Sequence, residues 1–279
     1  MRKGGTRQKM QHDFYHATLG KLPATVFRLG LSATYRPGKQ TIHKALDEGI
    51  NYLFHFGIDT QMTAVLRDVL HRDRERYVVA TGAYNYIWTH QNLRKTLEKR
   101  LRQLRTDYID VFHFLGVTKR EHLTPRVRAE LEEIRHDPRV RAVSVSIHDR
   151  ALAGELAAAG ALDALMVRYN AAHRGAENEI FPFLQAHHPG LISYTATRWR
   201  YLLRPPRGWP RGGRVPTAGM CYRFVLSNPQ VDVCLMAPSN ARHLAQNLAE
   251  VRQGPLCQED LAFMREFGDA VYRRYKYFM

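Results

Sequence analysis

The sequence has few cysteines, and their arrangement excludes one common class of small protein. Only three cysteines occur in the 279 residues, Cys221, Cys234 and Cys257, and no two of them have CxxC spacing. This pattern excludes a disulfide framework and argues against a structural zinc site. We therefore expect three reduced thiols in a cytoplasmic protein.

Long apolar runs are also absent. No stretch reaches the roughly 18 uninterrupted apolar residues of a membrane helix, so we expect no membrane partner. The first ten residues are basic but lack the apolar segment of a secretory signal. We expect residues 1–10 to be frayed, residues 1–20 to form a basic tail, and residues 21–279 to form one domain.

Acidic residues are scarce relative to basic ones. Asp and Glu total 26 against 42 Lys and Arg, which gives a formal net charge of +16. Such an excess indicates either an anionic partner or a general preference for arginine in the source genome, and the second explanation is favoured. No nucleic-acid-binding motif accompanies the charge, so we expect no nucleic-acid partner.

Short apolar runs rich in β-branched residues alternate with amphipathic stretches along almost the whole chain. Eight such pairs can be followed from residue 26 to residue 251, and a further helix is expected at residues 261–278. Alternation of this kind predicts parallel strands with right-handed crossovers, and eight units at this length favour a closed (β/α)8 TIM barrel. The expected strands are residues 26–32, 51–56, 77–81, 108–115, 140–147, 162–167, 191–195 and 231–236. The expected helices between them are residues 39–48, 60–71, 91–105, 125–135, 149–159, 177–187, 217–227 and 241–251.

Several short motifs stand in a fixed order along these units. They are Gly49-Ile50-Asn51, Thr106-Asp107-Tyr108-Ile109-Asp110, the run from Val140 to Ser146, Tyr169-Asn170, Tyr194, and residues 244–248 with Asn247. In this order and spacing the chain resembles the aldo-keto reductase superfamily from Leu29 to Val251. The resemblance implies a barrel that reduces carbonyls with NADPH, using a Tyr proton donor tuned by a Lys–Asp pair and a His that orients the carbonyl.

The four catalytic positions of that family carry other residues in this chain. The resemblance aligns the family's Asp with Phe54, its Tyr with Asp59, its Lys with Gly82 and its His with Leu115. A phenol with an ordinary pKa near 10 needs a nearby cation to donate a proton at neutral pH, and none of these replacements supplies one. We therefore expect a rebuilt active site.

The cofactor positions are retained only in part. The resemblance implies that Ser146 and Tyr194 contact the nicotinamide, but Ile147 and Met166 stand where the family has an Asn and a Gln. In the helix that resembles the adenine-binding helix, Asn247 is kept and Arg242 is placed to meet a 2′-phosphate. NADPH therefore stays an open possibility, and the cofactor is unknown.

Polar residues follow most of the predicted strands, at the barrel end where active sites form. The candidate proton carriers are His148, His113 and Asp59. His113 also fits a satisfied core histidine, because its position points it into the barrel. The candidate substrate-binding residues are His55, Tyr84, Arg168, Asn170, Arg198 and Trp199. Since arginines gather here, we expect a small, anionic ligand. No HxH or HExxH spacing supports a metal, and none is expected.

Three functions remain open at this point. The first is a reductase-fold enzyme with redox-neutral acid–base chemistry, such as isomerisation, elimination or cyclisation, on a small polar or anionic substrate. The second is a catalytically inactive barrel that acts as a binding or scaffold protein. The third is an NADPH-dependent reductase in which Tyr84 or His113 replaces the lost acid. The oligomeric state cannot be predicted.

Overall fold

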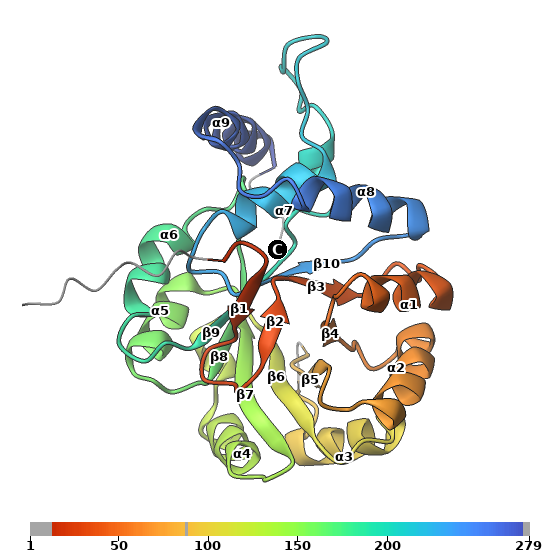
Figure 1. The fold of residues 1–279 in the computed structure, drawn as a ribbon. Helices are drawn as coiled ribbons and strands as arrows, with labels where there is room; N and C mark the ends of the chain where they lie inside the picture. Colours follow the sequence, from red (N-terminus) through yellow and green to blue (C-terminus); the bar gives the residue numbers. More distant parts are fainter. Residues whose placement is uncertain (1–12, 87–88, 276–279) are drawn as a thin grey trace, which may run out of the picture.

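The computed structural model describes residues 13–86 and 89–275. Within them, eight parallel strands close into a barrel in the order β10-β3-β4-β5-β6-β7-β8-β9, with helices around the outside (Figure 1). The chain is therefore a (β/α)8 TIM barrel, as the alternation predicts. The barrel strands are β3 (Leu29–Ser32), β4 (Tyr52–Phe54), β5 (Val78–Tyr84), β6 (Ile109–Val117), β7 (Val140–Ile147), β8 (Ala164–Arg168), β9 (Gly190–Tyr194) and β10 (Val233–Met236).

Each barrel strand is followed by helical structure that covers the outside of the barrel. The α-helices are α1 (Lys39–Asp47), α2 (Thr60–Arg72), α3 (Leu93–Leu104), α4 (Pro125–Arg135), α5 (Arg150–Ala158), α6 (Ala176–Glu179), α7 (Ala218–Leu226), α8 (Ala241–Val251) and α9 (Gln258–Arg274). Short 3₁₀ turns are η1 (Arg120–His122), η2 (Phe181–Phe183) and η3 (Tyr201–Leu203). In the described ranges no helix combines the length and the apolar character needed to cross a bilayer.

Two predicted elements are wrong in detail. The helix expected at residues 177–187 is broken into α6 and η2, because Ile180 has a φ of −127° and Pro182 has no N–H to continue the helix. The strand expected at residues 26–32 is divided at Arg28. The buried Arg28 guanidinium donates to the carbonyls of Val231, at 2.6 Å, and Asn228, at 3.2 Å.

A two-stranded hairpin precedes the barrel and closes its amino-terminal end (Figure 1). It consists of β1 (His16–Thr18) and β2 (Thr25–Phe27). The buried side chains of Leu19, Leu22 and Val26 join the cluster that fills the barrel interior. The tail expected at residues 1–20 is therefore too long, because residues 13–20 belong to the folded barrel, and residues 1–12 lie outside the described part.

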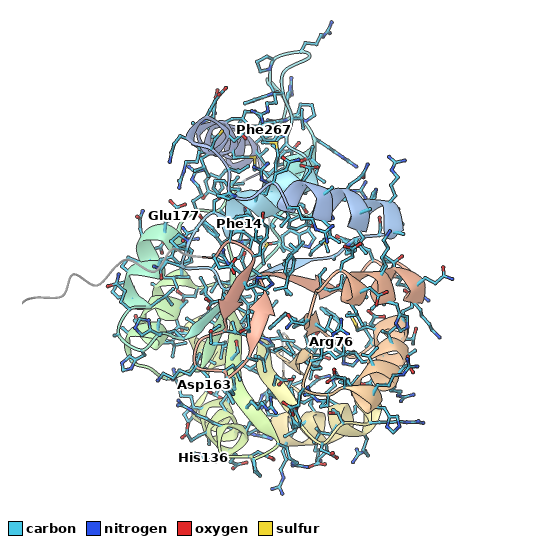
Figure 2. The ribbon with its side chains drawn as sticks, viewed as in Figure 1. Phe14, Arg76, His136, Asp163, Glu177 and Phe267 are labelled. Atoms are coloured by element: carbon cyan, nitrogen blue, oxygen red, sulfur yellow. The ribbon has the colours of Figure 1, made fainter. Side chains whose placement is uncertain are left out.

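The last helix, α9, packs beside α7 and the η3 turn. It begins at Gln258, three residues before the predicted start, since Cys257 caps it by accepting from the Asp260 amide. The Phe267 side chain, labelled in Figure 2, belongs to this helix. The Phe267 ring meets the Trp209 ring edge to face, with centroids 4.8 Å apart. The predicted helix extends to residue 278, and residues 276–279 lie outside the described part.

Candidate functional site

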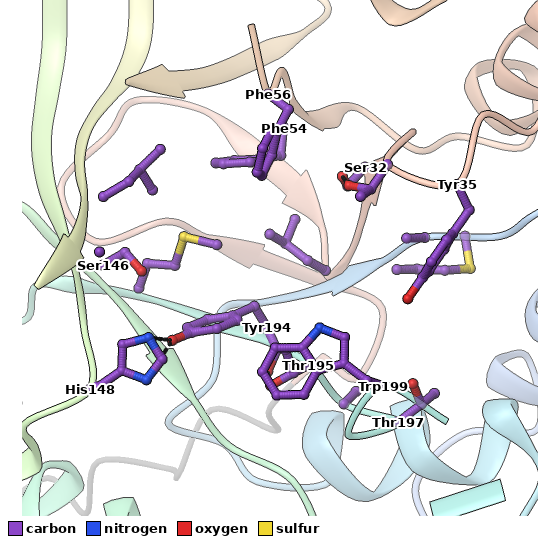
Figure 3. Close-up of a pocket in the computed structure, with 18 of the residues that line it drawn as sticks. Ser32, Tyr35, Phe54, Phe56, Ser146, His148, Tyr194, Thr195, Thr197 and Trp199 are labelled. Carbon is purple, nitrogen blue, oxygen red and sulfur yellow. Dashed lines mark hydrogen bonds between the residues drawn. The ribbon is translucent and has the colours of Figure 1, made fainter. Parts of the chain in front are cut away.

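A cavity of about 380 Å³ opens at the carboxyl end of the barrel strands (Figure 3). The Phe54, Leu115 and Met166 side chains form its apolar floor, and aromatic rings surround it. These rings belong to Tyr35, Phe56, Tyr84, Tyr194, Trp199 and Tyr222. Its volume lies in the range of small-molecule sites, and none of its described lining residues is Asp, Glu, Lys or Arg.

At one end of the cavity, His148 and Tyr194 form a hydrogen-bonded pair. The Tyr194 hydroxyl lies 3.0 Å from Nε2 of His148, and the two rings meet edge to face at 82°. His148 directly follows β7, and its amide extends the β-ladder by donating to the Val117 carbonyl. Asp149 then caps α5 by accepting from the Leu152 amide, so the backbone on both sides of His148 is fixed.

Burial sets the protonation states of this pair. Burial and, to a smaller extent, the Arg168 charge lower the pKa of His148, so its imidazole is neutral at pH 7. Burial raises the pKa of Tyr194 to about 12, although Arg168 and a hydrogen bond from Ser146 act in the opposite direction. Tyr194 is therefore a neutral phenol, and its hydroxyl donates to Nε2 of His148 or accepts from it, according to which nitrogen of the imidazole carries the proton.

Arg168 lies beside this pair without lining the cavity. It ends β8 and is the register partner of Tyr194 on β9. Its side chain is half-buried, and burial lowers the pKa of its guanidinium. Its positive charge lowers the pKa of both His148 and Tyr194. Arg168 thus influences the protonation of the pair without lining the cavity.

Hydroxyl groups occupy the other end of the cavity. Tyr222 on α7 accepts from the Ala237 amide, and burial raises its pKa strongly. Tyr35 lines the same end, and its side chain is 48% exposed at the rim. Nearby, the hydroxyls of Ser32 and Thr34 lie 2.7 Å apart. Sequence reasoning did not predict this end, because Tyr222 reaches the mouth from a helix and not from a strand end.

Comparison with known proteins agrees with the barrel fold. The model of the aldo/keto reductase family matches residues 34–198. This chain belongs to the aldo/keto reductase family. An aldo-keto reductase from Bacillus halodurans, in its holo form, superimposes with a TM-score of 0.72 at 18% identity, over 91% of this chain and 96% of that one. A protein assigned as an aldo-keto reductase from Pseudomonas aeruginosa gives 0.66 at 22% identity, over 87% and 95%. No curated protein matches significantly.

The four positions at which the resemblance places the reductase tetrad are Phe54, Asp59, Gly82 and Leu115, and the structure gives each of them a packing or capping contact. Phe54 and Leu115 are buried in the cavity floor, and the Phe54 ring meets Phe56 at a centroid distance of 6.0 Å. Gly82 lies against β6 so closely that an added Cβ would be 2.0 Å from the His113 carbonyl oxygen. The fourth position, Asp59, faces away from the cavity, as described next.

Asp59 and His55 are not site residues. Asp59 caps α2, because its carboxylate accepts from the amides of Gln61 and Met62 at 3.0 and 3.1 Å. His55 has the opposite strand parity to Phe54 and points into the helix layer, where its Nε2 lies 2.8 Å from the Thr63 hydroxyl. Burial lowers the pKa of His55 to about 3. Neither residue lines the cavity.

His113 points into the barrel as expected, but it is a core residue. It is fully buried below the cavity floor, and its Nε2 lies 3.4 Å from the Tyr52 hydroxyl. The Phe54 ring packs on it edge to face, which separates it from the cavity. Burial lowers its pKa to about 3, so we no longer consider it a proton carrier.

Asn170 and Arg198 are also structural. The Asn170 carboxamide accepts from the amides of Ala172 and His173 and donates to the Thr195 carbonyl, which organises the loop after β8. Arg198 is completely buried, and its Nε donates to Nε2 of His173 at 2.8 Å. Neither residue lines the cavity, so the two do not bind a ligand there.

Tyr84 and Trp199 do line the cavity. The Tyr84 hydroxyl donates to the Phe56 carbonyl at 3.3 Å, and the two rings are 5.2 Å apart. Trp199 is 37% exposed, and in Figure 3 its ring lies beside the Tyr194 end of the cavity. Of the predicted mouth residues, the structure thus brings together His148, Tyr84, Trp199, Ser146 and Tyr194, with Arg168 adjacent.

The described residues fit a nicotinamide ring better than they fit a whole NADPH molecule. Tyr194 offers a ring face and Ser146 a hydroxyl, but Met166 and Ile147 offer no amide. The cavity lining has no cation for the phosphates. Arg242 is exposed at the start of α8, and the Asn247 amide is buried against the Met236 sulfur. The residues therefore match the nicotinamide end of the cofactor more closely than its phosphate end. In the described ranges no three His, Cys, Asp or Glu side chains come together as a metal site would require.

Proposed function

We propose that this protein is an aldo-keto-reductase-fold enzyme whose barrel mouth carries out redox-neutral proton transfer on a small substrate. One observation carries the proposal: the His148–Tyr194 hydrogen bond faces the cavity. Among the described lining residues, His148 is the one side chain with an ordinary pKa near neutrality. An isomerisation, elimination or cyclisation that begins with removal of a proton suits this arrangement.

The roles of the residues follow from their protonation states. In the tautomer that carries its proton on Nε2, His148 donates to the Tyr194 hydroxyl, so Nδ1 of His148 is left to accept a proton from the substrate. Tyr194 then keeps its own hydrogen and donates it to the oxygen on which negative charge develops. Arg168 acts through these two residues, because its charge stabilises negative charge near Tyr194. His148 and Tyr194 are therefore the proposed catalytic residues, and Arg168 is a positioning residue.

Exchange of carbon-bound hydrogen tests this proposal without knowledge of the natural substrate. We would incubate the protein with 2-tetralone in D₂O and follow loss of the α-proton signals by NMR. General-base catalysis contributes about 10²- to 10⁴-fold, so His148→Ala should lose at least about 100-fold of the acceleration. His136→Ala is the matched control, because His136 lies exposed directly after α4 and does not line the cavity (Figure 2). Equal rates for wild type and His148→Ala, or an unchanged rate for Arg168→Ala, would overturn the assignment.

A second candidate is an NADPH-dependent reductase with a substitute proton donor. It is favoured by Tyr194 and Ser146, which keep the positions that contact the nicotinamide in the family, and Tyr84 is the remaining substitute acid at the cavity. Titration with NADPH decides it, since binding near Trp199 should quench tryptophan fluorescence. Absence of quenching at tens of micromolar NADPH would end this candidate.

A third candidate is a non-catalytic binding protein. The apolar packing of Phe54 and Leu115 in the cavity floor favours it, because these groups support binding and not proton transfer. It predicts ligand binding at the mouth without any exchange that depends on His148. The exchange experiment therefore separates it from the first proposal.

A further inference from the structure

The cavity has hydrogen-bonding groups at two opposite ends and an apolar middle. We propose that it binds an uncharged, flat, ring-containing molecule with one polar group at each end. The first group meets His148 and Tyr194, and the second meets Tyr35 and Tyr222. This inference concerns the same cavity as the proposed function, but it depends only on binding.

The first end offers both hydrogen-bonding directions. His148 provides an imidazole with one donor and one acceptor nitrogen, and Tyr194 provides a hydroxyl. Ser146 hydrogen-bonds to the Tyr194 hydroxyl and holds it in place. A carbonyl or hydroxyl group on the ligand fits these partners equally well.

The second end is built from hydroxyl groups on different elements. Tyr35 follows β3, and Tyr222 comes from α7. Because Tyr222 already accepts from the Ala237 amide, its hydroxyl hydrogen stays available to a ligand acceptor. Tyr35 is half exposed and lines the same cavity as Tyr222.

The middle of the cavity favours a ligand with a flat, apolar ring system. In Figure 3 the Phe54 and Phe56 rings lie on one side of the space, and the Tyr194 and Trp199 rings lie on the other. His148 and Tyr35 stand at opposite ends of the same view. Aromatic walls favour a ring that can stack or meet them edge to face.

The charge of the lining excludes an ion as the best ligand. No Asp, Glu, Lys or Arg occurs among the described lining residues, and Arg168 and Arg198 lie outside the lining. A charged group that enters this cavity loses its hydration and contacts no charged side chain of the lining, because Arg168 acts only from beside the His148–Tyr194 pair. Its transfer is therefore less favourable than that of a neutral group. The net charge of +16 therefore does not describe the chemistry of the cavity.

Three naphthalene probes test the inference by isothermal titration calorimetry on the full chain. They share one ring system: 2,6-dihydroxynaphthalene has two polar ends, 2-naphthol has one, and 2-naphthoate carries a charge. One neutral hydrogen bond corresponds to about a three- to tenfold change in Kd. We expect the diol to bind about three- to tenfold more tightly than 2-naphthol, and 2-naphthoate to bind most weakly.

The Tyr35→Phe variant locates the second end. In this variant the Kd of 2,6-dihydroxynaphthalene should rise to that of 2-naphthol, and the Kd of 2-naphthol should stay unchanged. Tyr86→Phe is the matched control, because Tyr86 is also an exposed tyrosine near the mouth but does not line the cavity. Both positions are exposed, so neither change should impair folding.

The outcomes separate this inference from the proposed function. Tighter binding of 2-naphthoate than of 2-naphthol would overturn it in favour of an anionic ligand. A diol that binds no better than 2-naphthol, a Tyr35→Phe variant that keeps the diol's advantage, or no binding of any probe would also overturn it. The exchange rate of 2-tetralone plays no part in these results, so either proposal can fail while the other holds.

Discussion

The Tyr194 hydroxyl and Nε2 of His148 lie 3.0 Å apart, although their strands β9 and β7 are separated by β8. The contact spans β8 and reaches the side of the mouth where Arg168 ends that strand. This arrangement places the positive charge of Arg168 beside Tyr194, a neutral acid, and His148, a neutral base. The pair is the centre of the chemistry that we propose.

The pH dependence of the exchange reaction should report His148. Because burial and Arg168 lower the pKa of His148, activity should rise with pH through a pKa below the ordinary histidine value and then stay level. Arg168→Met should move this rise to higher pH, since loss of a positive charge makes the imidazole easier to protonate. Arg168→Lys, which keeps the charge, is the control. A pH profile that is the same in Arg168→Met would contradict the role of Arg168.

Buried histidines should make the fold sensitive to acid. The pKa values of His55, His113 and His173 are lowered to about 3, so the unfolded chain binds more protons than the folded chain between about pH 3 and 6.5. Stability is then lost as pH falls through that window, by about 1.4 kcal/mol per pH unit for each group. His113→Leu should reduce the slope by about this amount in urea unfolding between pH 4 and 6. An unchanged slope would show that His113 is not neutral in the folded state.

Asp59 should behave as a helix cap and not as a proton carrier. Asp59→Ala should lower the free energy of unfolding by about 1 kcal/mol, whereas Asp59→Asn keeps the acceptor and should cost much less. Both variants should exchange 2-tetralone at the wild-type rate, because Asp59 does not line the cavity. Loss of exchange activity in the stable Asp59→Asn protein would return Asp59 to the catalytic site.

Gly82 should tolerate no side chain. An added Cβ would lie 2.0 Å from the His113 carbonyl oxygen, and this neighbour is backbone that cannot rotate away. We expect Gly82→Ala to destabilise the protein by about 1 to 3 kcal/mol in urea unfolding, as overpacking of a core does. A variant as stable as wild type would mean that β5 and β6 can separate at this point.

Local patterns predicted the barrel because each strand and helix follows from its own residues. The strand β7 and the helix α4, for example, have the predicted bounds, since an apolar run and a Thr-Pro helix start define them. The bounds of the strand predicted at residues 26–32 were wrong because a contact between residues far apart in the sequence determines where it ends. Arg28 interrupts a strand because carbonyls some 200 residues later surround it.

The candidate site could be predicted only in part for the same reason. Strand ends placed His148, Tyr84 and Tyr194 correctly at the mouth. Strand parity also predicted correctly that the His113 side chain points into the barrel. Parity does not show how far along the barrel axis a side chain lies, and His113 is buried below the cavity floor. Tyr222 was missed because the position of α7 over the mouth depends on packing that no local pattern records.

The tight approach of Gly82 to β6 limits how this barrel can be redesigned. A side chain at this position would need space that the His113 backbone already occupies. A new functional group therefore cannot be added here by one substitution, because β5 and β6 would first have to separate. Redesign is easier from positions such as Tyr222 on α7, whose side chain already lines the cavity.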